Sequence, residues 1–460
     1  MPIPVIVIFD IGKTNKKLFL FDESYQVVFE RSVTLPETVD EDDFPCEDIE
    51  ELSSWVLESL EDVCTQKEYD VKAVNFSAYG ASLVYIDENG KPLTPLYNYL
   101  KPYPTELSSA LYARYGGEEK FCKQTASPAL GSLNSGLQLY RLKQQQPNVY
   151  KQVRYALHLP QYLSSLLTGE YYSDITSIGC HTAMWNFNKN RYPDWIQQEG
   201  LAAKLAPVAP AEKPLAVKNY KVGIGLHDSS AALIPYLVSF KEPFLLISTG
   251  TWCISLNPFN QAPLTAEELK QDCLCYMQYQ GKPVKASRLF SGHEHDQQVN
   301  RIVDHFGCDA VAFNDLPFDP KLVERLKNEH SQILPPDEFI KEPAFATRDL
   351  AAFKTYAEAY HQLMMDLVQL QTISAKRVIN NPEVTRIYVD GGFSKNNIFM
   401  HLLAAAFPGM EVRAATAACA SAVGAALILH NHWNTKPVPG NIVQFIPRSG
   451  ELLFKKEPKH

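Results

Sequence analysis

Two short apolar runs separated by a polar turn open the chain. Residues Val5 to Phe9 are all apolar, and a second run from Leu18 to Phe21 ends at Asp22. Apolar runs of about four to eight residues bounded by turn residues are typical of buried β-strands. The chain is therefore predicted to begin with a strand, a turn and a second strand.

Helical and strand patterns then alternate along the first half. One face of a helix near residues 48–64 is apolar, formed by Ile49, Leu52, Val56, Leu60 and Val63. The stretch VKAVNFSAYG at residues 71–80 predicts a strand that runs into a glycine. YALHLPQYLSSLLTGEY at residues 155–171 predicts a helix stopped by Gly169. Strands alternating with helices indicate an α/β architecture.

A related order of elements returns after about residue 225. PFLLISTGTWCISLN at residues 243–257 predicts a strand, a small polar turn and a strand, and a long helix covers residues 356–378. RIYVDGGFSKNNIFMHLLAAAF predicts a strand, a Gly-Gly turn and an amphipathic helix with Ser394 as its N-cap. MEVRAA predicts a short strand, and TAACASAVGAALIL predicts a closely packing helix. The repeated order predicts two similar α/β domains that face each other across a cleft.

Composition narrows the class of protein. A chain of 460 residues is too long for one ordinary core, so two or three domains are expected. A net charge of -9 argues against nucleic acid or an anionic membrane as the main partner. Nine cysteines without a C-x-x-C pair indicate reduced thiols in a cytoplasmic protein. The first ten residues lack a basic signal-peptide region, and no stretch approaches the roughly 20 apolar residues of a membrane helix.

The triplet Gly12-Lys13-Thr14 resembles the end of a P-loop, but its surroundings exclude that motif. A P-loop needs a glycine five residues before its Gly-Lys pair, and Val7 stands there. It also needs a helix beginning at the lysine, where the pattern KKLFLF predicts a strand.

The same turn can hold phosphate in another way. Asp10 at the end of the strand could hold Mg2+, while turn N–H groups and the hydroxyl of Thr14 meet phosphate oxygens beside Gly12 and Asn15. The alternative is an ordinary hairpin in which Gly and Asn are turn formers.

A second hairpin carries the same chemistry in the other half. Ser248, Thr249, Gly250 and Thr251 offer hydroxyls and exposed N–H groups, with a glycine that permits close approach. Serine and threonine are common in turns, so this segment alone is a weak signal. Two such hairpins, one in each half, favour a phosphate site over turn chemistry.

Asp390-Gly391-Gly392 forms a glycine turn between a strand and a helix. With Ser394, Asn396 and Asn397 it could let a flat purine and a ribose lie against the backbone. The alternative is a plain strand-to-helix turn with a serine cap.

The stretch GIGLHDSSAAL contains a candidate general base. Gly223 and Gly225 begin a dinucleotide-binding pattern, but Asp228 replaces its third glycine, which argues against such a site. Asp228 is either an N-cap or a general base at a helix N-terminus with His227 beside it.

The stretch SGHEHDQQ contains His293, Glu294, His295 and Asp296. It does not match H-E-x-x-H, and neighbouring side chains point apart in regular structure, so a solvated loop or a substrate lid is favoured over a metal site.

In their order and spacing these segments resemble the FGGY carbohydrate kinases of the sugar kinase/Hsp70/actin superfamily, over most of the chain. DIGKTNKKLFLFD looks like the first phosphate motif of that family, ISTGTW like the second, VDGGFSKNNIFM like the adenosine motif and HDSSAAL like the segment with the catalytic aspartate. HD followed by small residues, STGTW and LPQYLSSLLTGEY are most similar to the rhamnulokinase-like branch.

The resemblance implies an α/β fold of two ribonuclease H-like (actin-like ATPase) domains, residues 1–225 and 226–460, flanking a cleft that binds ATP, Mg2+ and a sugar. It implies that Asp10 supports Mg2+ and that Asp228 is the base. The phosphate contacts it implies are Gly12, Thr14 and Asn15 on one side and Ser248, Thr249, Gly250 and Thr251 on the other. The adenosine contacts it implies are Gly391, Gly392 and Asn396.

The chain departs from the family where the sugar binds. PLYNYLKPYP lacks the acid and the arginine that many relatives carry, and SAYGASL lacks their polar Gln, His or Asp. The sugar contacts are therefore predicted among Tyr79, Gly80, Ser82, Asn98, Lys101, His181, His227 and Asp228. The predicted reaction transfers phosphate from ATP to a primary hydroxyl of a ketose such as L-rhamnulose. A kinase of a pentulose, fuculose or polyol, a non-catalytic actin-like or sugar-sensing protein, and a homodimer stay open.

Overall fold

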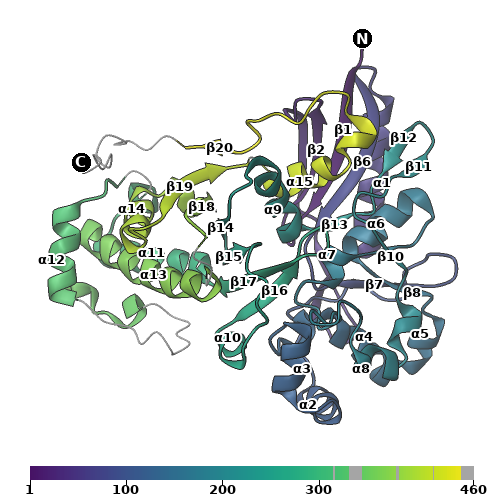
Figure 1. Cartoon of the computed structure of the whole chain (residues 1–460), viewed down its shortest axis with the longest axis horizontal. Coiled ribbons are helices and arrows are strands. Elements are labelled where there is room, and N and C mark those ends of the chain that lie inside the picture. Colours follow the sequence, from purple (N-terminus) through teal and green to yellow (C-terminus); the bar gives the residue numbers. More distant parts are fainter. Residues whose placement is uncertain (314–315, 331–343, 380–382, 418, 447–460) are drawn as a thin grey trace. The chain divides into compact units, whose positions relative to one another are not determined.

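The computed structural model describes residues 1–313, 316–330, 344–379, 383–417 and 419–446 (Figure 1). The chain forms two compact units, each described by itself. The first comprises residues 1–241, 260–285 and 418–442, and the second comprises residues 242–259, 286–417 and 443–460. Both contain a β-sheet and helices, which confirms the predicted α/β class.

The strands and helices of the first unit follow one another as β1 Ile3–Ile11, β2 Lys16–Asp22, β3 Val27–Val33, β4 Glu37–Val39, β5 Pro45–Glu47, α1 Ile49–Thr65, β6 Tyr69–Ala78, β7 Leu83–Ile86, α2 Thr105–Arg114, α3 Glu118–Thr125, α4 Ser135–Gln145, α5 Pro147–Gln152, β8 Tyr155–His158, α6 Leu159–Thr168, β9 Ser173–Asp174, α7 Ile175–Ile178, α8 Asp194–Gln198, β10 Val208–Ala209, β11 Leu215–Val217, β12 Tyr220–Val222, β13 Leu226–His227, α9 Asp228–Ser239, α10 Ala266–Lys270, β16 Cys273–Met277, α15 Ala420–Ile428 and α16 His430–Trp433. Those of the second unit are β14 Phe244–Thr249, β15 Cys253–Asn257, α11 Ser291–Phe306, α12 Pro320–His330, α13 Tyr356–Ile379, β18 Arg386–Gly391, α14 Asn397–Ala406, β19 Glu411–Thr416 and β20 Gln444–Phe445. Strand β17, Pro283–Leu289, begins in the first unit and ends in the second.

The sheet of the first unit has the order β11-β12-β6-β1-β2-β3, with β13 also paired to β6. Strand β1 runs parallel to β6 and antiparallel to β2. One face of β1 packs with apolar residues of α1 and α6, and the other face packs with apolar residues of α9 and α15. Burial of both faces explains the uninterrupted apolar run at the start of the chain, and the predicted strand-turn-strand is confirmed.

Helix α1 forms as its apolar spacing predicts. Its buried apolar residues are the five predicted ones, Ile49, Leu52, Val56, Leu60 and Val63. The side chain of Asp48 caps the helix by accepting hydrogen bonds from the N–H groups of Glu50 and Glu51.

The predicted helix over residues 155–171 is only partly correct. Its first four residues form strand β8, which pairs with β7, and helix α6 begins at Leu159 with Pro160 in its first turn. Proline is well placed there because its missing N–H has no partner within the helix. The helix ends as predicted at Gly169, whose φ of 65° is the left-handed conformation of a C-cap.

The second unit repeats the arrangement around β1. Strand β14 runs antiparallel to β15 and parallel to β18, and β18 is parallel to β19. The repeat predicted from the order of elements is therefore present, with β14, β15 and β18 in the places of β1, β2 and β6. Helix α13 covers the predicted long helical segment.

Helix α15 comes from the last tenth of the chain but packs within the first unit. A Cβ atom added at Gly424 would lie 1.9 Å from the carbonyl oxygen of Ala231 in α9. The small residues of α15 therefore permit the close helix packing that the sequence predicts. The domain boundary between residues 225 and 226 stays a prediction.

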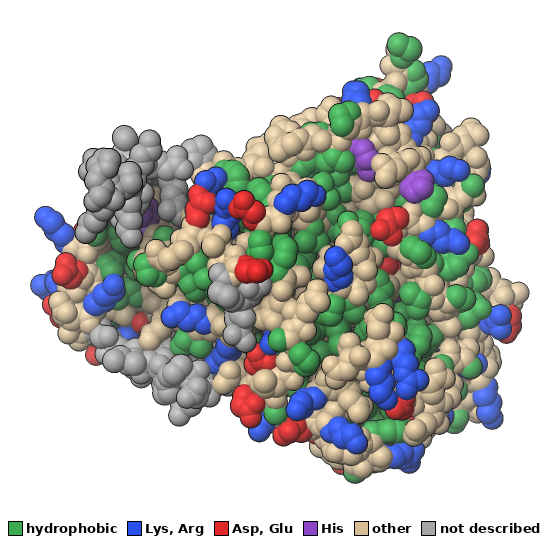
Figure 2. Space-filling view, viewed as in Figure 1, with side chains coloured by type: hydrophobic (Ala, Val, Ile, Leu, Met, Phe, Trp, Pro, Cys, Tyr) green, Lys and Arg blue, Asp and Glu red, His purple; other side chains and the backbone are tan. Residues whose placement is uncertain are grey.

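Basic and acidic side chains are interspersed on the face of the molecule in Figure 2. Among the described residues, no helix combines the length and the apolar character needed to cross a bilayer. All nine cysteines carry free thiols.

Candidate active site

The turn between β1 and β2 is organised by a buried lysine. The N–H of Gly12 donates to the carbonyl oxygen of Asn15 at 3.0 Å. Lys16, whose side chain is 3% exposed, donates from Nζ to the carbonyl oxygens of Gly12 at 3.1 Å and Lys13 at 2.9 Å. In a trans peptide the N–H points opposite to the C=O, so the N–H groups of Lys13 and Thr14 point away from Lys16. The turn thus presents donors outward, as an anion site requires.

A buried carboxylate holds this lysine. Glu47, 8% exposed, forms an ion pair with Lys16, with Oε2 2.9 Å from Nζ, and its Oε1 accepts a hydrogen bond from Lys13 Nζ at 3.2 Å. The hydroxyl of Tyr79, a predicted sugar contact, donates to the same Oε1 at 2.8 Å. Glu47 therefore connects the predicted phosphate turn with the loop after β6. Sequence reasoning missed both Lys16 and Glu47.

Asp10 and Asp228 lie at the same edge of the first sheet. Strands β1 and β13 both run parallel to β6, and Asp10 and Leu226 both pair with Ser77. Asp228 follows two residues after Leu226, so both acids stand near the carboxyl ends of the two strands that pair with the end of β6, the edge at which α/β sheets bind ligands. Burial, aided by repulsion from the Asp228 charge, raises the pKa of Asp10 to about 6, although Ser421 Oγ donates to its Oδ2 at 2.9 Å.

Asp228 is the first residue of helix α9, and His227 occupies the N-cap position. The carboxylate accepts hydrogen bonds from the N–H and the hydroxyl of Ser229 instead of capping later N–H groups. The N-cap alternative is therefore wrong. Burial raises the pKa of Asp228 to about 6, while 35% of its side chain remains exposed. An accessible carboxylate with a raised pKa suits a general base.

His227 is a neutral ring packed beside Asp228. Burial lowers its pKa to about 4, and it stacks on Tyr276 with ring centroids 5.5 Å apart. His227 Nε2 lies 3.2 Å from Asp228 Oδ1, and a Cβ atom added at Gly80 would lie 2.8 Å from the same nitrogen. Gly80 therefore leaves room for the ring, and His181 adds a second imidazole 6.1 Å from that of His227.

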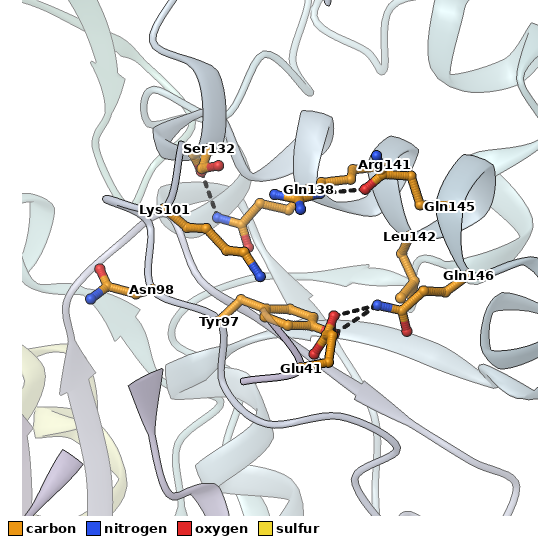
Figure 3. Close-up of a pocket in the computed structure, with 10 residues that line it drawn as sticks. All are labelled: Glu41, Tyr97, Asn98, Lys101, Ser132, Gln138, Arg141, Leu142, Gln145 and Gln146. Carbon is orange, nitrogen blue, oxygen red and sulfur yellow. Dashed lines mark hydrogen bonds between the residues drawn. The ribbon is translucent and has the colours of Figure 1, made fainter. Parts of the chain in front are cut away.

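The other predicted sugar contacts make bonds within the unit. Lys101 pairs with Asp40 at 2.5 Å and Asp42 at 2.8 Å, and Asn98 Nδ2 donates to the carbonyl of Pro45 at 3.1 Å. Asn98 and Lys101 line a cavity of about 30 Å³ together with Glu41, Tyr97, Ser132, Gln138, Arg141, Leu142, Gln145 and Gln146 (Figure 3).

Such a cavity has room for one or two water molecules, which is too little for a sugar. Ser82 is buried, and its hydroxyl donates to the carbonyl of Tyr97 at 3.4 Å. Among the predicted sugar contacts, His227 lies against Asp228, and Gly80 and His181 lie beside His227.

The second predicted phosphate turn is bonded to the predicted adenosine turn. Thr249 Oγ1 donates to the carbonyl of Asp390 at 2.5 Å and accepts the N–H of Phe393 at 3.0 Å. Gly391 has a φ of 87°, and a Cβ atom added to it would lie 1.8 Å from the carbonyl oxygen of Thr249. Glycine is required there because both its conformation and its close approach exclude a side chain.

Both turns face one pocket of about 450 Å³ within the second unit, a volume typical of small-molecule sites. Five predicted nucleotide contacts line it, namely Thr249, Gly250, Thr251, Gly392 and Asn396. Ser248 lies in β14, one residue before this lining. Sequence reasoning missed the lining residues Gly292, Tyr360, Phe393 and Lys395, and it assigned His295 and Asp296 to a solvated loop or substrate lid instead of this pocket.

The predicted loop around SGHEHDQQ is wrong, because these residues begin helix α11. A Cβ atom added at Gly292 would lie 1.8 Å from the carbonyl oxygen of Gly250, so the start of the helix packs directly on the second predicted phosphate turn. His295 and Asp296 lie one turn further along. The helical spacing of the apolar Val299 and Ile302 was the available signal.

The predicted N-cap is also wrong. Ser394 lies in a short 3₁₀ turn and donates to the carbonyl of Gly391, while Asn396 caps helix α14 by accepting the N–H of Phe399 at 2.9 Å. Its Nδ2 donates to the hydroxyl of Tyr360 at 2.7 Å.

Substitution of Gly391 or Gly392, the two adjacent glycines of this turn, by alanine is expected to change the stability by very different amounts. Gly391→Ala is expected to lower the free energy of unfolding by about 2–3 kcal/mol, because it combines a clash with an unfavourable φ. Gly392→Ala is the matched control, since an added Cβ atom there meets nothing within 4 Å. Denaturant unfolding of both variants measures the difference, and equal stabilities would contradict the close approach.

Two family models match the chain. The FGGY family of carbohydrate kinases, N-terminal domain, matches residues 5–217, and the carbohydrate kinase FGGY, C-terminal domain, matches residues 241–437. A rhamnulokinase from Oceanobacillus iheyensis is 23% identical over 230 residues, covering 47% of each chain. An L-fuculokinase from Salmonella typhi is 24% identical over 278 residues, covering 54% of this chain and 55% of the relative. The chain thus spans about half the length of the curated relatives it matches.

Solved structures share the fold over nearly the whole chain. A carbohydrate kinase from Novosphingobium aromaticivorans has a TM-score of 0.79 at 22% identity, covering 97% of this chain and 94% of the other. Plasmodium falciparum glycerol kinase with ADP has a TM-score of 0.72 at 16% identity, covering 94% and 90%. These likenesses confirm the predicted pair of actin-like ATPase domains. The two models cover both halves of the sequence, so the chain belongs to the FGGY family of carbohydrate kinases.

Proposed function

We propose that this chain is an ATP-dependent carbohydrate kinase that phosphorylates a hydroxyl of a ketose. The observation that carries the proposal is the placement of Asp10 and Asp228 beside an outward-facing donor turn at one edge of the first sheet. Phosphoryl transfer needs such an arrangement, because catalysis depends on positioning and on stabilising charge.

The pocket of the second unit is the proposed nucleotide site. Thr249, Gly250 and Thr251 would contact the phosphates, and Gly392 and Asn396 would line the adenosine, with Gly391 packed behind them on Thr249. The glycerol kinase of similar fold contains ADP, which supports an adenine nucleotide here.

Asp228 is proposed to accept the proton of the attacking sugar hydroxyl. Because its pKa is raised to about 6, Asp228 is mostly deprotonated at neutral pH and is still basic enough to accept a proton. His227 lies beside this carboxylate and is neutral, so it would orient the carboxylate without cancelling its negative charge. The outward N–H groups of Lys13 and Thr14 would contact phosphate oxygens, where charge must be stabilised during transfer.

Asp10 has the chemistry to hold Mg2+. Carboxylate oxygen is the ligand type that Mg2+ prefers, and two carboxylates whose charges repel favour a cation beside them. When bound, the ion would offset the negative charge of the phosphates. Asp10 would hold it, with Ser421 fixing one carboxylate oxygen.

A 6-deoxyketohexose such as L-rhamnulose is the proposed substrate. Rhamnulokinases recur among the curated relatives, including those from Oceanobacillus iheyensis and Halalkalibacterium halodurans. L-Fuculose is the second candidate, because an L-fuculokinase matches over a similar share of the chain.

A thermal-shift screen tests the proposal. Ketoses and polyols are added one at a time, with and without a non-hydrolysable ATP analogue. L-Rhamnulose is expected to raise the melting temperature most, since a ligand that binds only the folded state stabilises it. Stabilisation by nucleotide with no effect of any sugar would instead favour an actin-like or sugar-independent nucleotide-binding protein.

A further inference from the structure

A chain of hydrogen bonds follows one wall of the pocket in the second unit. Asn396 Nδ2 donates to the hydroxyl oxygen of Tyr360 at 2.7 Å. That hydroxyl lies 3.0 Å from His295 Nε2, and His295 Nδ1 lies 3.0 Å from Asp296 Oδ1. All four residues line the pocket, and they come from helices α11 and α13 and the turn before α14.

The direction of the chain follows from its first donor. An amide Nδ2 can only donate, so the hydroxyl of Tyr360 accepts from Asn396 and is left to donate its own proton to His295 Nε2. This places the imidazole proton on Nδ1, which then donates to Asp296. Burial lowers the pKa of His295, which keeps the ring neutral. The His295 ring thereby orients the carboxylate of Asp296. It occupies one of the roughly four acceptor positions of that carboxylate and leaves the others for a ligand.

The carboxylate also lies at a defined height above the phosphate turn. Gly292, in the first turn of α11, packs on Gly250 of that turn. Asp296 follows four residues later, about 6 Å further along the helix axis and on the same face. In a nucleotide, the ribose follows the phosphates by a comparable distance.

We propose that Asp296 accepts hydrogen bonds from the vicinal 2′- and 3′-hydroxyls of the nucleotide's ribose and that His295 is its positioning residue. A carboxylate is also the group that binds the ribose 2′-hydroxyl in dinucleotide-binding proteins. The pocket would then select ribonucleotides over deoxyribonucleotides. This inference rests on the proposed function, because it takes the pocket of the second unit to hold a nucleotide.

Calorimetric titration with ADP, 2′-deoxy-ADP and 3′-deoxy-ADP, without sugar, tests the inference. The wild-type chain is expected to bind ADP about five- to tenfold more tightly than either deoxy analogue, since a hydrogen bond to a charged group is strong but this carboxylate is 80% exposed. Asp296→Ala is expected to reduce that preference to about twofold or less. Asp304→Ala is the matched control, because Asp304 is an exposed aspartate further along the same helix and outside the pocket lining.

The ratio between ADP and its analogues cancels any general effect of removing a negative charge. Both aspartates are exposed, so either substitution is expected to change the stability by about 0.5 kcal/mol at most. A wild-type preference that survives Asp296→Ala, or a wild-type chain that binds all three nucleotides equally, would overturn the ribose assignment alone. A wild-type chain that binds none of them would overturn the proposed nucleotide site as well. Loss of the preference in Asp304→Ala would also count against the assignment.

Discussion

Replacing Asp228 with asparagine is expected to lower sugar-dependent ADP release by about 10²–10⁴-fold, the usual contribution of a general base. Asparagine keeps the shape of the side chain but cannot accept the hydroxyl proton. The variant is expected to fold and to bind ADP as the wild type does, because the lining of the nucleotide pocket comes from the second unit alone. A coupled assay for ADP with the best sugar of the screen measures the loss. Asp194→Asn is the control, since Asp194 is a surface residue paired with Arg191 at 2.7 Å.

The pH dependence of the wild type checks the same residue. Asp228 must be deprotonated to act, and its pKa is raised to about 6, so kcat/KM is expected to fall about tenfold per pH unit below pH 6. Asp10 has a similarly raised pKa, so the acidic limb of the pH profile reports the titration of Asp10 and Asp228 together.

The free energy of unfolding is expected to change with pH in the direction opposite to kcat/KM. The folded chain binds the proton of Asp228 more tightly than the unfolded chain, so its free energy of unfolding declines as the pH rises from about 4 to about 6. Asp228→Asn is expected to weaken that decline. Near-full turnover by this variant would reject Asp228 as the base.

Removing the carboxylate of Glu47 is expected to lower the free energy of unfolding by about 3–5 kcal/mol, because it leaves the buried ammonium of Lys16 without its counter-charge. The effect should reach the phosphate turn, since Lys16 holds the carbonyl groups of Gly12 and Lys13. Denaturant unfolding of Glu47→Ala measures the change.

Two further variants separate the ion pair from other causes. Glu30→Ala removes the acid of an exposed pair with Lys17 in the same sheet and is expected to change the stability by about 1 kcal/mol at most. The double variant Lys16→Met with Glu47→Gln is expected to recover much of the loss, because no buried charge is left unpaired. A Glu47→Ala chain as stable as Glu30→Ala would show that Glu47 does not hold the turn.

The two hairpins could be predicted from the sequence because their apolar runs are continuous and end at turn residues. The runs at Val5 to Phe9 and Phe244 to Ile247 are buried on both sides of their sheets, so local pattern and burial agree. Helix α1 was predicted for the same reason, since its spacing alone determines the buried face.

Contacts between distant segments could not be predicted. Glu47 is a charged residue in a short exposed-looking stretch, and its partner Lys16 is 31 positions earlier in the sequence. Nothing local distinguishes it from a surface carboxylate. Tyr360 likewise meets His295 and Asn396 only in the folded unit.

The missed start of helix α11 has a local cause. Its first turns carry glycine, two histidines and two acids, so the apolar period becomes visible only at Val299 and Ile302. The misplaced cap before α14 arose because serine and asparagine are both good N-caps, and a one-turn 3₁₀ segment separates the two candidates.

Asp228 is proposed to activate a sugar hydroxyl for attack on ATP. The most direct test incubates the wild-type chain with ATP, Mg2+ and each sugar of the panel, and follows ADP release together with the phosphorylated sugar. We predict ADP release that depends on a ketose and equals the amount of sugar phosphate formed. ADP release at the same rate without any sugar, or no turnover with any of them, would contradict the account.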